Sequence, residues 1–525
     1  MRAEPTKTAG NSWARCSIEG AGAALLLMLP LLYLQISPLH TDLYHRMLPM
    51  NTAFRGMFVD LVVSIAVCAL LARLLDRLDG AGKTLWWLLA LDFLLMRLTI
   101  CLGNEEILSR KISPTRVFVA MAIVGLLVWL ARRSWYSAIV RGARMTVVLV
   151  GFAIFWILPE LGVMAAHREP HDAASFTKAI RSRPQRRIVW ILLDELSWDQ
   201  AFEHRYPGLS LPHFDAMAAE SVAFSHVQPA GYYTELVVPS LLQGKIVTAE
   251  RSDLDGRLSV KTQGLHRWHP YPVESTLFAD ARRAGWATAV AGWYLPYCRT
   301  YAPVLDECYW TFSATPLAGG YSENRSAMWN ALAPLRKPLL QLVGKKLRLP
   351  TTAQNHGADY EGILEQGQAM IAEGNMGFVM IHLPVPHPAG FYNRKTGKIG
   401  VSGSYVDNLA LADTTLGELM EEIRKTPLAD ETTVVVSGDH SWRVPLWRAE
   451  FDWTKEDELA SGHGRFDPRP MVIAHFPGEE NGVRVDQTFP LIAMHEMFEA
   501  MIAGEIENAQ QLEQWVRKQP VARGQ

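Results

Sequence analysis

The chain has 525 residues, of which 49% are hydrophobic and 20% charged, and its formal net charge is −2. This length exceeds that of a usual single domain, and the balanced charge without a long basic run argues against a nucleic-acid-binding protein. The averages conceal an asymmetry, because the first third is apolar with short basic loops and the remainder has the composition of a globular domain.

Five apolar segments in the first third each have roughly the 20 residues needed to cross the hydrocarbon core of a bilayer. They are residues 20–36, 56–75, 84–102, 116–130 and 145–164. The first segment is not expected to be a cleavable signal, because four more segments follow and no small-residue cleavage pattern closes it.

The loops between these segments predict their orientation. Ten Lys and Arg residues fall on one side and five on the other, which places the N-terminus inside. With five spans, the chain after about residue 166 lies outside. The sequence thus predicts a transmembrane domain over 1–166, a polar linker over 167–186 and an extracytoplasmic domain over 187–525.

Two cysteines of the predicted external domain, Cys298 and Cys308, flank a short loop that contains proline. An oxidising compartment would let them close a small disulfide. Two free thiols are the alternative.

A run of six apolar residues, 188–193, leads directly into Asp194 and Glu195. Such a run is typical of a strand buried on both faces of a parallel sheet. Ligands bind beyond the carboxyl ends of these strands, and a carboxylate pair buried there needs a cation or hydrogen bonds. The alternative is that Asp194 caps a following helix.

A second apolar strand, over residues 433–437, ends in Gly438, Asp439 and His440. Two strand ends that offer Asp-Glu and Asp-His predict one mixed oxygen and nitrogen metal site, assembled from distant parts of the sequence.

Helical patterns alternate with further apolar strands along the external domain. Helices are predicted over 212–220, 275–284, 359–373, 407–425 and 491–502, and strands over 288–291, 377–383 and 471–476. This alternation predicts an α/β domain whose central sheet is mostly parallel and covered on both faces.

The loop over residues 231–244 contains Thr234 ahead of a Pro239-Ser240 segment that is expected to start a helix. A hydroxyl at a helix N-terminus lies where backbone N–H groups favour an anion, and a nearby divalent metal lowers the pKa of such a hydroxyl. A capping or packing role is the alternative for Thr234.

Taken in order, the strand ending in Asp194, the loop with Thr234, the His387 segment and the Gly438-Asp439-His440 turn resemble the alkaline phosphatase superfamily in its sulfatase-like branch. The resemblance covers residues 186–505. It implies that Thr234, ten residues before Gly244, occupies the nucleophile position, with Ser240 as the alternative. The Cys-x-Pro-x-Arg core of sulfatases is absent, and a threonine cannot become formylglycine, which puts sulfate-ester chemistry in doubt.

The resemblance also assigns roles to residues in three further loops. His387, between two prolines, is similar to the family histidine that touches the phosphate or sulfate, or a second metal, whereas His382 is interpreted as a packed strand histidine. His463 is similar to a zinc-ligating histidine of the superfamily phosphodiesterases, with an exposed loop histidine as the alternative. Arg443 is expected to neutralise a phosphate oxygen, unless it is an ordinary surface charge.

Spans followed by such a domain look like the lipoteichoic-acid synthases and phosphoethanolamine transferases of bacterial cytoplasmic membranes, with the catalytic domain facing the periplasm. This likeness implies a phospholipid donor, a lipid or glycan acceptor, no nucleic acid, and transfer through a phospho-threonine. The expected ligands of Zn²⁺ or Mn²⁺, which suit the set better than Ca²⁺ or Mg²⁺, are Asp194 or Glu195, Thr234, Asp439 and His440. His387 and His463 would act as general acid and base. The alternatives are a membrane-anchored phosphodiesterase or other hydrolase, and a non-catalytic membrane scaffold.

Overall fold

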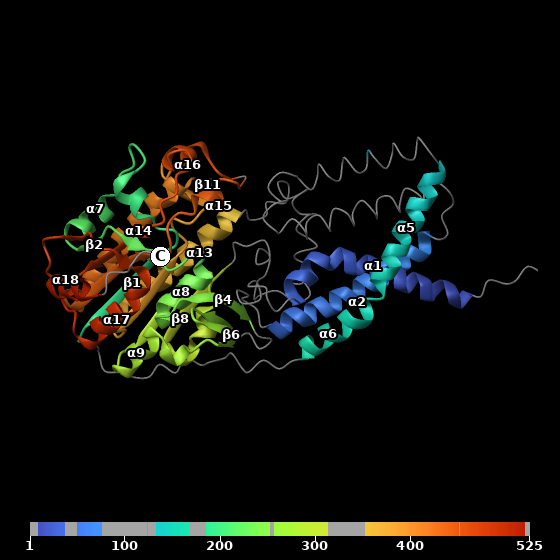
Figure 1. Ribbon diagram of the computed structural model, residues 1–525, viewed down its shortest axis with the longest axis horizontal. Helices are drawn as coiled ribbons and strands as arrows, with labels where there is room; N and C mark the ends of the chain where they lie inside the picture. Colours follow the sequence, from blue (N-terminus) through green and yellow to red (C-terminus); the bar gives the residue numbers. More distant parts are fainter. Residues whose placement is uncertain are drawn as a thin grey trace, which may run out of the picture. The chain divides into compact units, whose positions relative to one another are not determined.

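The computed structural model describes residues 9–36, 50–75, 123, 133–166, 185–252, 257–312, 352–450 and 452–519. These residues form two compact units (Figure 1). The first contains the N-terminal helices, and the second is an α/β domain whose first described strand starts at Arg187.

The helices of the first unit are α1 (Ala9–Ile36), α2 (Met50–Leu75), α5 (Arg133–Gly151) and α6 (Ile154–Ala166). Helices α1, α2 and α6 share a small apolar core that includes Leu25, Phe54 and Leu161. Helix α5 is tied to α1 by an ion pair of 2.6 Å between Arg144 Nε and Glu19 Oε1.

Among the described residues of this unit, one helix is long and apolar enough to cross a bilayer, and a bent pair of helices passes the same test when it is taken as one span. The helix is residues Phe54–Leu74 of α2, and the pair is Arg144–Gly151 and Ile154–Ala166, which is bent by 41°.

The predicted span over 20–36 falls within α1, while the span over 84–102, all of the span over 116–130 except residue 123, and nearly all of the linker over 167–186 lie outside the described residues. The five-helix bundle therefore stays a prediction.

The second unit is built on an eight-stranded sheet in the order β14-β2-β13-β12-β1-β9-β7-β8. Its strands are β1 (Arg187–Leu193), β2 (Val222–Phe224), β7 (Thr288–Trp293), β8 (Glu307–Thr311), β9 (Phe378–Leu383), β12 (Thr432–Gly438), β13 (Val472–His475) and β14 (Val483–Val485). The five strands from β12 to β8 run parallel. The predicted mostly parallel sheet is confirmed, although β13, over the predicted strand 471–476, runs antiparallel to both of its neighbours.

Helices cover both faces of this sheet (Figure 1). One face carries α8 (Thr234–Gln243), α9 (Leu277–Arg283), α17 (Met494–Ala503) and α18 (Ala509–Lys518), and the other carries α7 (Pro212–Ala219), α13 (Thr352–Ala372) and α14 (Tyr405–Lys425). Strand β1 alternates between them: Trp190 belongs to the first core and Ile191 to the second. Both are fully buried, and each such side chain stabilises the fold by about 1.5–3 kcal/mol.

Smaller elements frame the sheet. They are α10 (Tyr297–Thr300), α15 (Val444–Trp447), α16 (Lys455–Ala460), the antiparallel strands β4 (Val247–Ser252), β5 (Leu258–Thr262) and β6 (Leu265–Pro270), the hairpin β10 (Gly390–Asn393) and β11 (Lys398–Gly403), and the short pair β3 (Val227–Gln228) and β15 (Phe489–Pro490). None of these was predicted. Strand β6 illustrates why such elements were not predicted. Its side chains are exposed or half-buried, and its sequence contains no apolar run that would indicate a strand.

Candidate active site

The register of the two central strands brings the predicted carboxylates together. Strands β1 and β12 pair in parallel with Leu193 opposite Gly438, so the next residues, Asp194 and Asp439, leave adjacent strand ends. Glycine is needed at the end of β12, because a Cβ at Gly438 would lie 2.6 Å from the carbonyl oxygen of Leu196.

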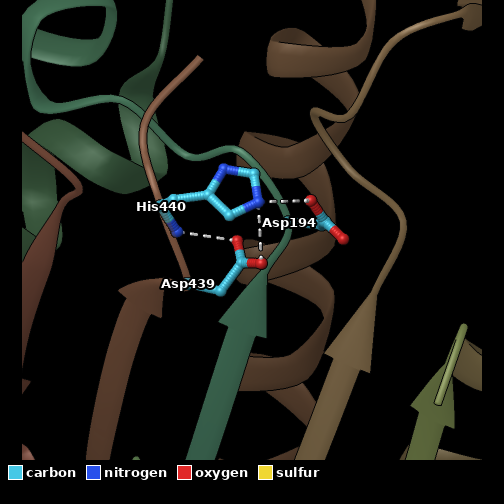
Figure 2. Close-up of side chains that lie close together, drawn as sticks. All are labelled: Asp194, Asp439 and His440. Atoms are coloured by element: carbon cyan, nitrogen blue, oxygen red, sulfur yellow. Dashed lines mark hydrogen bonds and ion pairs between the residues drawn. The ribbon is translucent and has the colours of Figure 1, made fainter. Parts of the chain in front are cut away.

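Asp194, Asp439 and His440 form a fully buried cluster just beyond these strand ends (Figure 2). His440 Nε2 lies 3.2 Å from Asp439 Oδ2 and 4.0 Å from Asp194 Oδ1. The other ring nitrogen, Nδ1, lies 3.2 Å from the carbonyl oxygen of Ser441. Because a carbonyl only accepts, Nδ1 carries the hydrogen and the Nε2 lone pair faces the two carboxylates.

Thr234 completes the cluster from the sheet face that α8 covers. Its Oγ1 donates to Asp194 Oδ2 at 3.2 Å and lies 3.3 Å from His440 Nε2. Helix α8 begins at Thr234, five residues earlier than predicted, and its N-cap is Tyr233. The Thr234 hydroxyl is therefore directed at the cluster instead of capping the helix.

These residues fit a divalent cation. Asp194 Oδ1 and Asp439 Oδ2 are buried without a hydrogen-bond partner, and one ligand atom from each of Asp194, Asp439 and His440 lies within 4.8 Å of the others. Burial, with the charges of Asp439 and Glu195, raises the pKa of Asp194 well above its ordinary value. Two such carboxylates are costly to bury unless a cation lies between them. Burial also lowers the pKa of His440 to about 3, which leaves a neutral imidazole able to bind a metal.

Glu195, the other expected first ligand, forms an ion pair with the guanidinium of Arg443. Its Oε1 accepts from Arg443 Nε at 2.7 Å and from Trp447 Nε1 at 2.8 Å, and its Oε2 accepts from the Arg443 backbone N–H at 3.0 Å. Glu195, Asp194 and His387 also lie within 4.8 Å of one another, but the Arg443 guanidinium neutralises this carboxylate. Asp194 is therefore the better placed ligand.

The backbone of Glu195 is held in the left-handed region, with φ of 63°. A non-glycine residue there is strained and persists only where neighbours hold it. The Glu195 N–H donates to Asp439 Oδ1 at 3.1 Å, and the Tyr405 hydroxyl donates to its carbonyl oxygen at 2.8 Å. This turn sends the two adjacent carboxylates to different partners.

Arg443 and His387 lie at the edge of the cluster, each with a side chain that is 14% exposed. Arg443 Nη2 is 3.4 Å from His387 Nε2. Burial opposes the charge on Arg443, but Glu195 and Asp194 outweigh it and raise the pKa of the guanidinium. Burial lowers the pKa of His387 well below its ordinary value, and the Arg443 charge adds to this effect.

His463 is not brought into the cluster. Its side chain is 73% exposed, and its Nδ1 lies 3.7 Å from Glu458 Oε1. It stands in the turn after α16 with a positive φ, between Gly462 and Gly464, which also have positive φ. Of the described residues, the groups able to hold a metal do not include His463. The alternative of an exposed loop histidine describes it better.

Ser240 is buried, and its hydroxyl both donates and accepts a hydrogen bond within the protein. Its Oγ donates to the carbonyl oxygen of Leu236 at 2.6 Å and accepts from the Val247 N–H at 2.8 Å. It is not available as the nucleophile.

His382 is packed in β9 as predicted, with no exposed surface, but it also faces the cluster. Its Nε2 lies 3.6 Å from Asp194 Oδ2 and has no hydrogen-bond partner. Sequence reasoning gave it no role at the site. The available signal was its place near the carboxyl end of a buried parallel strand, beside β1.

Cys298 and Cys308 form a disulfide, which joins α10 to β8. The remaining cysteines among the described residues, Cys16 and Cys68, lie in helices α1 and α2.

Part of the chain matches a known protein family. The Sulfatase family model matches residues 186–463, just over half of the chain, and no curated protein matches. Among solved structures, Ps i-CgsB in complex with k-i-k-neocarrahexaose is 14% identical, with a TM-score of 0.41 over 63% of this chain and 74% of that one.

The lipoteichoic acid synthase LtaP from Listeria monocytogenes is 12% identical, with a TM-score of 0.38 over 63% of this chain and 73% of that one. The phosphonate monoester hydrolase of Agrobacterium radiobacter is 14% identical, with a TM-score of 0.37 over 61% and 74%. The expected sulfatase-like branch of the alkaline phosphatase superfamily is confirmed by the family match, and the chain is an enzyme that belongs to the sulfatase family.

Proposed function

We propose that this enzyme is a membrane-anchored, metal-dependent transferase that moves phosphoethanolamine or phosphoglycerol from a lipid donor through a phospho-threonine. The observation that carries this proposal is the placement of Thr234 Oγ1, 3.2 Å from Asp194 Oδ2 and 3.3 Å from His440 Nε2. A threonine hydroxyl is suited to attack phosphorus, and it cannot supply the formylglycine of sulfatases.

Asp194, Asp439, His440 and Thr234 would hold Zn²⁺ or Mn²⁺, which suits a set of carboxylates, imidazole and hydroxyl. When bound, such a cation supplies Lewis acidity that lowers the pKa of the hydroxyl and offsets phosphate charge. Asp194 Oδ2 accepts the hydrogen bond of the Thr234 hydroxyl and orients Oγ1.

The reaction has two balanced steps. The Thr234 hydroxyl gives up its proton as Oγ1 attacks the donor phosphorus, the ester bond to diacylglycerol breaks, and the departing oxygen takes a proton. The acceptor hydroxyl then attacks the phospho-threonine, loses its proton, and restores the Thr234 hydroxyl. Arg443 would neutralise a phosphate oxygen, and His387, whose Nε2 lies 3.4 Å from Arg443 Nη2, would exchange protons with the departing and entering oxygens.

Anchoring beside a lipid donor is supported by the first unit. Helix α2 leaves large apolar side chains exposed along its length, among them Val63, Val67, Leu70 and Leu74, as expected of a surface that faces lipid. The Cys298–Cys308 disulfide suits an oxidising compartment. The helix surface supports membrane anchoring and the disulfide supports an external catalytic domain, and the proposal places the protein in a bacterial cytoplasmic membrane.

A hydrolase would use the same residues with water as the acceptor, so only the fate of the head group separates it from a transferase. A non-catalytic scaffold is disfavoured, because the buried cluster retains a hydroxyl, two carboxylates and an imidazole within reach of one another.

The test uses the full chain in lipid nanodiscs that contain phosphatidylethanolamine or phosphatidylglycerol, with Zn²⁺ or Mn²⁺ and an amphiphilic glycan acceptor. Diacylglycerol release and head-group transfer to the acceptor should both fall by about a thousandfold or more in Thr234→Ala. Head group released to water alone would identify a hydrolase. No diacylglycerol from either lipid would contradict the proposal.

A further inference from the structure

A second imidazole approaches the cluster from the side opposite β12. His382 lies in β9, opposite Leu192 of β1 and Gly292 of β7. Its Nε2 is 3.6 Å from Asp194 Oδ2. Its Nδ1 is 2.7 Å from the hydroxyl oxygen of Tyr297. Tyr297 and His382 are both fully buried, so their contacts with each other and with Asp194 lie in the protein interior.

Two features fix Tyr297 against the sheet. Its ring lies over Gly292 so closely that a Cβ at this glycine would be 2.3 Å from Tyr297 Cδ2. The next residue, Cys298, is bonded to Cys308, which pairs with Val290 of β7. Close packing of its ring on Gly292 and the disulfide between α10 and β8 therefore hold Tyr297 in place.

We propose that Tyr297 and His382 form a positioning pair for the metal-binding carboxylate of Asp194. A carboxylate oxygen only accepts, so the favourable tautomer places the hydrogen of His382 on Nε2, directed at Asp194 Oδ2. The other nitrogen, Nδ1, is then an acceptor, and the Tyr297 hydroxyl donates to it. This inference rests on the proposed metal site.

The pair would determine how Asp194 presents its two oxygens. Oδ2 accepts a hydrogen bond from the Thr234 hydroxyl at 3.2 Å, and His382 Nε2 lies 3.6 Å from the same oxygen. Oδ1 is left without a hydrogen-bond partner, on the side of His440. Groups that hold a metal ligand in this way typically contribute 10–100-fold to metal affinity.

The test measures zinc affinity of the full chain in detergent by competition with a chelator. Tyr297→Phe should weaken zinc binding by about 10–100-fold, and His382→Leu by at least as much. His382→Gln should recover part of the loss, because its amide N–H can still donate to Asp194. A role in folding alone would not be rescued in this way.

The matched control is Tyr360→Phe. The Tyr360 hydroxyl is also buried and lies 2.7 Å from Thr415 Oγ1 of α14 in the opposite core, not against a residue of the cluster, so its loss should leave zinc affinity unchanged. Wild-type affinity in both Tyr297→Phe and His382→Leu would overturn the positioning role and leave the metal site intact. A loss in His382→Leu that Tyr297→Phe does not share, and that His382→Gln does not relieve, would overturn it in favour of direct ligation. A wild-type protein that binds neither zinc nor manganese would overturn the metal site itself.

Discussion

The residues of the site form two groups. One group would bind the cation, and the other balances the charges around it. Glu195 is fully buried, and Arg443 is its charge partner, bound through its guanidinium and its backbone. Removing one partner of a buried pair leaves the other charge uncompensated, which costs about 3–5 kcal/mol.

Arg443→Met should therefore reduce the free energy of unfolding by about 3 kcal/mol and also weaken substrate binding. The matched control is Arg448→Met, which breaks the more exposed pair with Glu458 and should change the free energy of unfolding far less. Urea unfolding of the purified full chain measures both changes. Equal losses in the two variants would show that the Glu195–Arg443 pair does not behave as a buried pair.

The residues of the site were predictable to different degrees. Asp194, Asp439 and His440 follow apolar strands directly, and strand register alone places them together. Glu195 and Arg443 were expected to face the cation and the phosphate, but their mutual pairing depends on a left-handed turn that the sequence does not reveal. The exposure of His463 depends on a turn of the same kind.

At the scale of elements, long apolar or strongly periodic segments were predictable and short ones were not. Helix α14 covers the predicted range 407–425 and starts two residues earlier at a capping box of Ser404 and Asp407. The sequence predicted strand β13 but not its direction. Its antiparallel direction results from pairing with β12 and β2, and an apolar run does not indicate strand direction. Strands β4 to β6 pair with one another, and pairing of such short segments is decided by tertiary structure.

The segment before β13 is held by ion pairs, which predicts a dependence of stability on pH. Arg469 hydrogen bonds lower the pKa of Glu203 to about 2. A carboxyl whose pKa is depressed by folding stabilises the protein above its unfolded pKa, here about 4.5, and this contribution is lost as the pH falls toward 2.

Glu203→Gln should therefore lower the urea midpoint at pH 6, and the difference from wild type should shrink at pH 3. Glu513→Gln is the control, because Glu513 pairs with Arg517 on the surface of α18 and its loss should change little. A Glu203→Gln difference of the same size at both pH values would contradict this reading.

For the whole molecule, the proposed function requires the catalytic domain to be attached to a membrane. The exposed apolar face of α2 and the bent pair of α5 and α6 predict that the full chain stays with bacterial membranes after alkaline carbonate extraction. A protease added outside intact spheroplasts should release the part after about residue 166. Extraction by carbonate, or protection from the protease, would contradict the predicted anchoring or orientation.

The most direct test of the central claim is the mass of the peptide that contains Thr234 after the full chain has reacted with phosphatidylethanolamine or phosphatidylglycerol without an acceptor. We predict one phosphoethanolamine or phosphoglycerol group on Thr234, absent from Thr234→Ala and retained in Ser240→Ala. An adduct on another residue, or head-group transfer by Thr234→Ala at the wild-type rate, would contradict a phospho-threonine route.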